Sequence, residues 1–123
     1  MNSLKLPLIT GLKKATIEMM LLKLLSESDM YGYQMTQELK KRSTGIYTLL
    51  EGSMYPILYR LSDQGYISFY EQKITQRQSR VYYHLEEKGI EYLKQLLTNY
   101  NQFLDVISFL LDSKTGDVYQ GKK

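Results

Sequence analysis

The segment Glu51-Gly52-Ser53-Met54-Tyr55-Pro56-Ile57-Leu58-Tyr59-Arg60-Leu61 presents two faces of different chemistry when it is wound into a helix. One face is apolar at the helical spacing i, i+3, i+4 and i+7, and it consists of Met54, Ile57, Leu58 and Leu61. The other face carries hydroxyls, aromatic edges and a proline ring, on Ser53, Tyr55, Pro56 and Tyr59. We therefore expect a helix whose apolar face is buried and whose other face suits a polar groove.

The boundaries of this helix follow from a proline and a glycine. Pro56 deep inside a helix would lose a backbone hydrogen bond and clash with an earlier carbonyl, at about 3 kcal/mol, so we expect the helix to begin between Glu51 and Ser53. Thr48 and Glu51 have the spacing of a capping box, and this alternative would start the helix earlier. Gly65 is the residue type expected just past a helix end, where φ is positive.

Two strands and a basic connection follow the helix. Residues 66–74 and 80–85 mix apolar and polar side chains, and the second stretch alternates between them at a period of two residues. The connection, residues 72–80, contains three cations and no acid, which is typical of a basic hairpin tip. A helix and a basic hairpin after two earlier helices form the element order of a winged helix-turn-helix. The predicted fold class is mainly α with a small β-hairpin (α+β).

Four stretches together resemble a known family. They are Met30-Tyr31-Gly32-Tyr33-Gln34-Met35, residues 51–61, Gly65-Tyr66-Ile67, and Arg80-Val81-Tyr82-Tyr83-His84-Leu85 followed by Gly89. Their residues and spacing are similar to those of the PadR family of bacterial transcriptional regulators, in a short form with a single C-terminal helix, over about residues 10–89. Leu50 and Glu86 depart from the family pattern, which affects the expected starts of two helices and leaves the outward pattern of residues 53–59 intact.

The resemblance implies a dimeric DNA-binding regulator that acts as a repressor. It also implies, where spacing alone does not, a small aromatic or drug-like effector that binds near the dimer interface and weakens DNA binding. The sequence has no tryptophan to form an aromatic slab there, so the effector stays open.

Length and composition limit the alternatives. A chain of 123 residues and 14.5 kDa with 43% hydrophobic residues has room for one domain with a modest core. It contains no cysteine, which excludes disulfides and thiolate metal sites and agrees with a reducing cytoplasm. No apolar run reaches the length of a membrane span, and residues 1–7 lack the apolar core of a secretory signal. We expect a cytoplasmic protein without a membrane partner.

The net charge of +3 is distributed unevenly. Residues 1–85 contain 11 Lys and Arg against 7 Asp and Glu, whereas residues 86–112 contain 2 against 5. The first part of the chain is therefore the better binder of a polyanion such as DNA.

Two helices are expected before the central one. Residues 10–26 are apolar nearly all round, so part of this helix, including Leu12, is expected to meet another chain, and core filling accounts for its Met pair better than a ligand pocket does. A second helix over residues 32–43 ends in Lys40, Lys41 and Arg42, which we interpret as favourable charges at the negative end of the helix dipole. Residues 46–48 are expected to add a short strand to the edge of the hairpin.

A long helix over residues 87–112 predicts a homodimer. Its apolar residues are spaced alternately by three and four, as in a heptad seam, at Ile90, Leu93, Leu97, Tyr100, Leu104, Ile107 and Leu111. If the helix instead folded back on its own domain, the apolar residues of its second half would stay exposed. The expected organisation is a winged helix-turn-helix DNA-binding domain over residues 1–86, a dimerisation helix over 87–112, and a polar tail over 113–123.

The DNA-binding hypothesis gives the outward residues distinct roles. Ser53, Tyr55, Pro56 and Tyr59 are expected in the major groove of double-stranded DNA, although Tyr55 and Tyr59 could instead pack as core between helices. Phosphate contacts are expected from the hairpin and from the first turn of the preceding helix, at Lys73, Arg77, Arg80, Tyr33 and Gln34. Two such domains related by a twofold axis predict an inverted-repeat operator with half-sites about one turn apart.

Residues for enzymatic chemistry are missing from the pattern. His84 is the sole histidine, it lies opposite Tyr83 and Leu85 on its strand, and no second histidine or cysteine supplies metal-binding spacing. We expect no catalytic residue, no cofactor and no metal. The alternative to a DNA-binding regulator is a winged-helix adaptor that binds another protein through the long helix and does not bind DNA.

Overall fold

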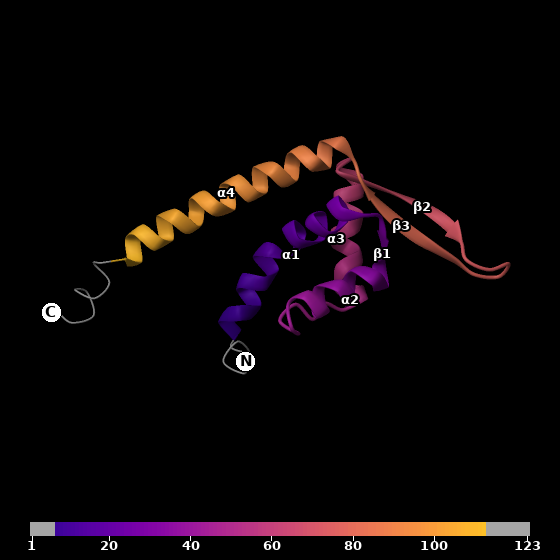
Figure 1. The fold of residues 1–123 in the computed structure, drawn as a ribbon, viewed down its shortest axis with the longest axis horizontal. Helices are drawn as coiled ribbons and strands as arrows, with labels where there is room; N and C mark the ends of the chain where they lie inside the picture. The colour runs from indigo at the N-terminus through magenta and orange to yellow at the C-terminus, as the bar shows by residue number, and fades with distance from the viewer. Residues whose placement is uncertain (1–6, 113–123) are drawn as a thin grey trace. The chain divides into compact units, whose positions relative to one another are not determined.

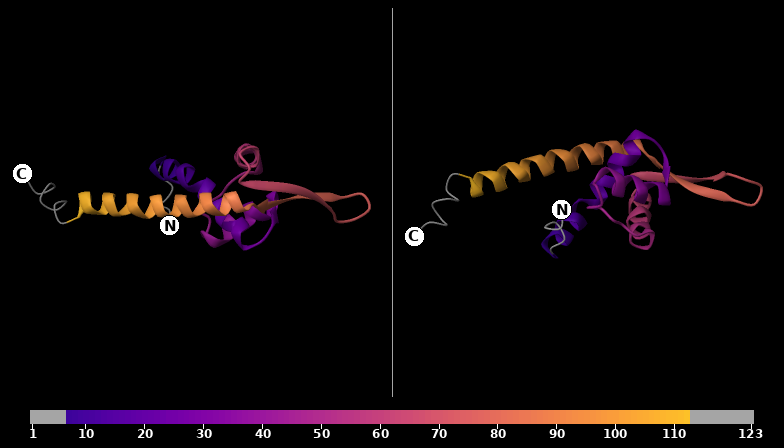
Figure 2. Two further views of the ribbon diagram at one scale, coloured as in Figure 1. Left: turned by 90° about the horizontal axis from the view of Figure 1, so that it is seen from above. Right: turned by 60° about the horizontal axis from the view of Figure 1, so that its bottom comes forward.

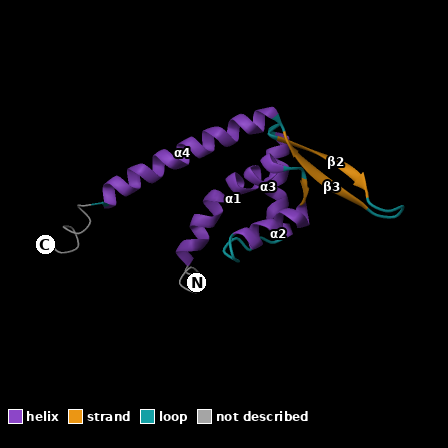
Figure 3. Ribbon diagram, viewed as in Figure 1, coloured by secondary structure: helices purple, strands orange, loops and turns teal. Residues whose placement is uncertain are grey.

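The computed structural model describes residues 7–112. In that part of the chain the elements follow in the order α1 (Pro7–Glu27), β1 (Met30–Tyr31), α2 (Gly32–Arg42), α3 (Glu51–Asp63), β2 (Ile67–Lys73), β3 (Ser79–Leu85) and α4 (Glu87–Leu111) (Figures 1 and 3). The predicted fold class, mainly α with a small sheet, is confirmed. The predicted polar tail, residues 113–123, lies outside the described residues.

The chain forms two units, residues 1–93 and residues 94–123, and the division falls inside α4. In the first unit α2 and α3 lie next to each other, and the β2–β3 hairpin reaches beyond the helices in each view (Figures 1 and 2). Its core is aliphatic and methionine-rich and is drawn from all its elements. The core consists of Ile17, Met19, Leu21, Leu22, Leu24, Leu25, Met30, Met35, Leu39, Met54, Leu58, Leu61, Ile67, Leu85 and Leu93.

The sheet has three antiparallel strands in the order β1-β3-β2, with Met30 opposite Tyr83 and Ile67 opposite Leu85. The two strands of the hairpin lie where the sequence predicted them. The edge strand predicted at residues 46–48 is wrong, because this segment forms local turn contacts instead: the Tyr47 N–H donates to Ser43 Oγ (2.8 Å). The third strand is β1, which precedes α2.

The ends of α3 are set by backbone geometry and not by a side-chain cap. Its N-cap is Leu50, in extended conformation and without a side-chain hydrogen bond, so the helix begins at Glu51 and the capping-box alternative is wrong. At the other end the Gly65 N–H donates to the Ser62 carbonyl (3.0 Å) and the Tyr66 N–H to the Leu61 carbonyl (3.0 Å). Gly65 has φ of +82°, so the predicted glycine stop is confirmed as a Schellman motif.

The remaining helices agree with the prediction within a few residues. α1 begins at Pro7, three residues earlier than expected, and proline is favoured at the first helical position because its missing N–H would have no partner there. α2 ends at Arg42 with Ser43 as its C-cap, and α4 ends at Leu111.

The start of α4 crosses the end of α3 at very short range. A Cβ added at Gly89 would lie 2.1 Å from the Tyr66 carbonyl oxygen and 2.6 Å from Leu85 Cδ1. The Glu86 N–H donates to the Tyr66 carbonyl oxygen (3.0 Å), and Lys88 Nζ donates to the Gln64 carbonyl (2.9 Å). Only glycine fits at this crossing.

We therefore expect Gly89→Ala to destabilise the protein by about 2 kcal/mol, since the new methyl group overlaps backbone atoms that cannot move freely. The matched control is Gly52→Ala in the first turn of α3, where an added Cβ meets nothing within 4 Å. Because alanine has the higher helix propensity, that variant should be neutral or more stable by up to about 1 kcal/mol. Urea unfolding followed by circular dichroism compares the two, and equal stabilities would disprove the tight crossing.

Candidate nucleic-acid interface

The two faces of α3 differ in burial as the sequence predicted. Met54, Leu58 and Leu61 are fully buried and Ile57 is half-buried, whereas Ser53 and Pro56 on the opposite side are exposed. Tyr59 is 74% exposed and Tyr55 is 42% exposed. The alternative that both tyrosines pack in the core is therefore wrong for Tyr59.

Tyr55 has a mixed environment. Its hydroxyl donates to Glu51 Oε2 (3.1 Å), and a Cβ at Gly32 would lie 2.5 Å from the same hydroxyl oxygen. The ring therefore packs against the first residue of α2, which must be small. Burial and the Glu51 carboxylate raise the pKa of Tyr55, so its hydroxyl stays protonated at neutral pH. Glu51 also puts an acid on this surface, which the sequence analysis did not single out.

A hollow of about 500 Å³ brings together predicted residues from three elements. Tyr33 of α2, Tyr55 of α3 and Arg80 of β3 all line it. The guanidinium carbon of Arg80, opposite Gln72 and next to the hairpin tip, lies 4.3 Å from the centre of the Tyr31 ring, a cation–π contact that orients this charge.

The hairpin tip holds the other two predicted cations. Lys73, at the end of β2, and Arg77, in the connection, are both exposed. The connection is closed by its own backbone, because the N–H groups of Ile74 (2.8 Å) and Thr75 (3.0 Å) donate to the Gln78 carbonyl. A closed tip of this kind presents its charges to solvent at a fixed place.

A second hollow, of about 230 Å³, lies between α2 and the segment that leads into α3. Tyr33, Gln37 and Lys40 line it from α2 at the spacing i, i+4 and i+7. Lys40 lines this hollow together with Glu51 at the start of α3. It has no ion-pair partner among the described residues, so its charge is available to a ligand. The sequence analysis assigned Lys40 to the helix dipole in preference to phosphate binding, although its spacing from Tyr33 was readable. Gln34 is half-buried and lines neither hollow.

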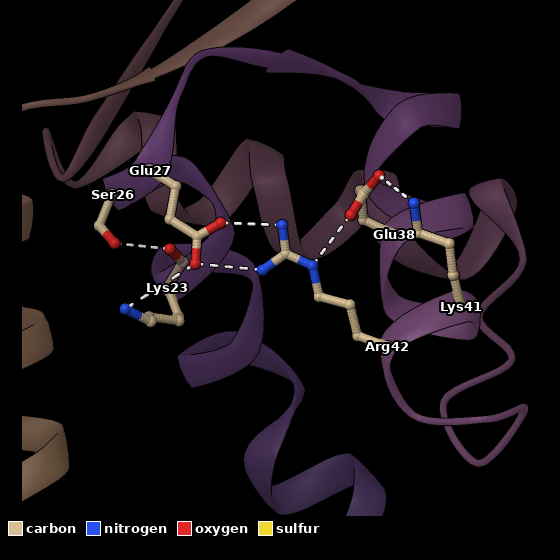
Figure 4. Close-up of polar contacts among 6 residues, drawn as sticks. All are labelled: Lys23, Ser26, Glu27, Glu38, Lys41 and Arg42. Atoms are coloured by element: carbon tan, nitrogen blue, oxygen red, sulfur yellow. Dashed lines mark hydrogen bonds and ion pairs between the residues drawn. The ribbon is translucent and has the colours of Figure 1, made fainter.

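The other two cations at the end of α2 are paired with acids (Figure 4). Arg42 NH2 lies 2.8 Å from Glu27 Oε1 of α1, and Arg42 Nε lies 2.9 Å from Glu38 Oε1. Lys41 Nζ lies 3.6 Å from Glu38 Oε2. The hydrogen bonds from Arg42 hold the pKa of both carboxyl groups below the usual value. These contacts connect α2 to the end of α1 and distinguish Lys41 and Arg42 from Lys40.

The sole basic residue of α3 is also paired. Arg60 NH2 lies 2.7 Å from Glu18 Oε1 of α1, and the Arg60 side chain is 51% exposed. The outward face of α3 thus presents hydroxyls and rings, and the unpaired charge lies beside it on α2 and on the hairpin.

His84 lies on the face of β3 opposite Tyr83, as predicted, and it belongs to a small polar cluster. Its Nδ1 lies 2.8 Å from Asp29 Oδ1, while Asp29 Oδ2 accepts a hydrogen bond from the Tyr70 hydroxyl (2.7 Å). No group of three or more His, Cys, Asp or Glu side chains within residues 7–112 could hold a metal ion. In the same range, no helix combines the length and the apolarity that crossing a membrane requires.

Comparison with known proteins places this geometry in a family. Residues 21–95 match the model of the transcriptional regulator PadR-like family. A transcriptional regulator from Clostridium thermocellum is 27% identical with a TM-score of 0.76, over 83% of this chain and 96% of that chain. A PadR-like transcriptional regulator from Bacillus cereus is 27% identical with a TM-score of 0.72, over 84% and 98%.

One similar structure contains DNA. Bacillus subtilis PadR in complex with operator DNA is 25% identical with a TM-score of 0.61, over 66% of this chain and 46% of that chain. This chain therefore spans about half the length of that relative.

The His84–Asp29 pair gives a pH-dependent contribution to stability. The hydrogen bond that His84 donates to Asp29 raises the pKa of His84. Burial raises the pKa of Asp29, but the hydrogen bonds from His84 and Tyr70 lower it by more, so the net shift is downward. The histidine contribution is full below the usual pKa of about 6.5 and is lost as pH rises through the raised value. The aspartate contribution is lost only at acid pH, below about 4.

We expect His84→Gln to lower the melting temperature most between about pH 5 and 6.5, and to approach the wild-type value as pH rises above this window. Asp29→Asn removes the other partner and should give the same pH profile. Thermal unfolding at a series of pH values measures both variants. A constant difference from pH 5 to 9 would show that the charged pair does not contribute.

Proposed function

The chain belongs to the PadR-like family of transcriptional regulators, and from this premise we propose that it binds promoter DNA as a homodimer and represses transcription. A transcriptional regulator is not an enzyme, which agrees with the lack of a catalytic constellation in the sequence. The observation that carries the proposal is the outward face of α3 beside an acid-free hairpin tip. The relative from B. subtilis that was solved with operator DNA supports the same reading.

The outward residues of α3 enter the major groove in this proposal. The hydroxyls of Ser53, Tyr55 and Tyr59 reach base edges or phosphates, and the ring of Pro56 touches thymine methyl groups. Side chains that reach base edges can distinguish bases, whereas contacts to the phosphates bind all sequences alike.

The cations around α3 hold the phosphates. Lys73, Arg77 and Arg80 contact the backbone from the hairpin, and Tyr33 and Gln34 add contacts from the first turn of α2, where free N–H groups favour anions. We add Lys40 to these proposed phosphate contacts, because it lines a hollow beside the start of α3.

Dimerisation uses the apolar seam of α4. Beyond residue 93 the seam residues Leu97, Tyr100, Leu104 and Leu111 are each at least 39% exposed in the single chain, and Ile107 is half-buried. Exposed apolar rows of this length are covered by a partner in stable proteins. Leu12 of α1, 58% exposed, belongs to the same interface. Leu93 is removed from it, because this residue is buried in the core of its own chain.

The dimer determines the form of the operator and the place of an effector. Twofold symmetry requires an inverted repeat, with half-sites about one helical turn apart. A small aromatic or drug-like compound binds between the two copies and weakens DNA binding, with the family resemblance as its support. Since the chain has no tryptophan, tyrosine and phenylalanine side chains of α4 would supply the aromatic surface.

Selection of genomic DNA fragments by the purified protein tests the function. The recovered fragments should share an inverted repeat upstream of genes, and binding should weaken steeply as salt increases because counterions are released from the phosphates. An adaptor that binds a protein through the α4 seam would recover no common sequence. That result would replace the regulator reading with the adaptor reading.

Lys40→Ala and Arg77→Ala should each weaken binding to all DNA sequences and reduce the slope of log Kd against log salt by about 1, since one phosphate contact is lost. Lys41→Ala is the matched control, because its ammonium is paired with Glu38 and should change the slope little. Fluorescence anisotropy between about 50 and 200 mM salt measures the slopes. A slope in Lys40→Ala that equals the wild-type slope would place Lys40 outside the interface.

Leu97→Asp combined with Leu104→Asp should convert the dimer into monomers, because two buried carboxylates per helix cannot be accommodated in an apolar seam. Gln95→Asp with Gln102→Asp puts the same charges on the opposite face of α4 and should leave the dimer intact. Sedimentation velocity measures the assembly, and circular dichroism checks that both variants are folded. A folded seam variant that remains dimeric would contradict the proposed interface.

A further inference from the structure

One carboxylate of α1 joins the last helix to the outward helix. Glu18 Oε2 accepts a hydrogen bond from the Tyr92 hydroxyl of α4 (2.5 Å), and Glu18 Oε1 accepts one from Arg60 NH2 of α3 (2.7 Å). The Glu18 side chain is 24% exposed, so the bridge is partly screened from water. A single group thus contacts both helices, at residues separated from it by 42 and 74 positions in the sequence.

The bridge is charge-assisted at both ends. The hydrogen bond to Glu18 raises the pKa of Tyr92 to about 12, so the hydroxyl keeps its proton and donates it at neutral pH. The guanidinium of Arg60 is permanently charged. Both oxygens of the carboxylate are therefore engaged by donors that stay in place across the physiological pH range.

Other contacts join the start of α4 to the end of α3. The Tyr92 ring stacks on the Tyr66 ring with centres 4.1 Å apart and planes 6° apart. Tyr66 directly follows the glycine stop of α3, and Lys88 donates to the Gln64 carbonyl at the same place (2.9 Å). The start of α4 therefore lies against the end of α3, and Glu18 adds a contact to Arg60 in the last turn of α3.

We infer that Glu18 is a positioning residue that couples the direction of α4 to the direction of α3 through Tyr92 and Arg60. The inference rests on the proposed function, in which α4 joins two copies and α3 enters DNA. In such a dimer the separation of the two α3 helices is set by the angle between α3 and α4 within each copy. A bridge that fixes this angle makes the protein selective for one spacing between operator half-sites.

The bridge can be opened from either end with conservative substitutions. Tyr92→Phe removes the hydroxyl donor and keeps the ring that stacks on Tyr66. Glu18→Gln keeps the shape of the side chain and removes the charge that pairs with Arg60. Tyr66→Phe is the matched control, because it removes a hydroxyl from the other ring of the same stack without touching Glu18.

The first measurement uses duplexes with the selected operator at its native spacing and with one base pair inserted between the half-sites. The ratio of the two affinities should fall by about threefold to tenfold in Tyr92→Phe and Glu18→Gln, the size expected when a mutation weakens coupling between sites. Affinity for a single half-site should stay unchanged in Tyr92→Phe, which leaves the Glu18–Arg60 ion pair in place. The Tyr66→Phe control should keep the wild-type ratio.

The second measurement does not involve DNA. The chain has no cysteine, so Asp63→Cys in α3 and Thr98→Cys in α4 give two unique positions for spin labels. Labelled protein is diluted with unlabelled protein so that only distances within one copy are recorded by electron paramagnetic resonance. The distance distribution should be broader in Tyr92→Phe and Glu18→Gln than in the wild type and in Tyr66→Phe.

The two measurements separate the failure of this inference from the failure of the proposed function. Distributions of equal width in all variants would overturn the coupling role of Glu18. Broader distributions with an unchanged spacing ratio would also overturn it, since the bridge would then not affect DNA reading. If no DNA fragment is selected at all, the proposed function fails, and the label distances alone decide whether Glu18 fixes the two helices.

Discussion

The burial of one stripe on α3 determines most of what the molecule can present to a partner. Met54, Leu58 and Leu61 are removed almost completely from water, which contributes roughly 1.5–3 kcal/mol for each side chain. A rotation of α3 about its axis would expose these residues, so the opposite face, with Pro56 and Tyr59, is fixed outward by the same energy. The function therefore depends on packing that does not itself touch the partner.

The second constraint is the crossing between the end of α3 and the start of α4. Gly65 ends one helix with a positive φ, and Gly89 lets the next helix approach the Tyr66 carbonyl. The two glycines have different roles. Gly65 lets the chain turn at the end of α3, and Gly89 lets α4 contact this turn after the hairpin has brought the chain back to it. For the chain to return to this point, β2 and β3 must have equal lengths, and their residues do pair one to one.

The sequence was most informative where one helix or strand carries its own signal. The α3 stripe, the Gly65 stop, the hairpin and the extent of α4 were all readable from periodicity and turn residues. A strand of two residues, Met30–Tyr31, has no readable period, and the β-branched and aromatic run at 46–48 resembles a strand although Ser43 holds it in a turn. The ion pairs of Arg42 and Arg60 join residues 15 and 42 positions apart, and no local pattern reports such distances. Sequence alone could not separate Lys40 from its paired neighbours.

The pairing of cations with acids determines where positive charge remains on the outward surface. Arg60, in the last turn of α3, is paired with Glu18, and α3 has no other basic residue, so its outward face carries no unpaired positive charge. Unpaired cations remain at its borders, at Lys40 on one side and on the hairpin on the other. A surface that was cationic throughout would bind any duplex through its phosphates. Under the proposed function, the charged borders place the protein on the DNA backbone, while the neutral centre discriminates between base edges. Under the proposed function, Glu18 therefore contributes to selectivity by neutralising Arg60 on α3.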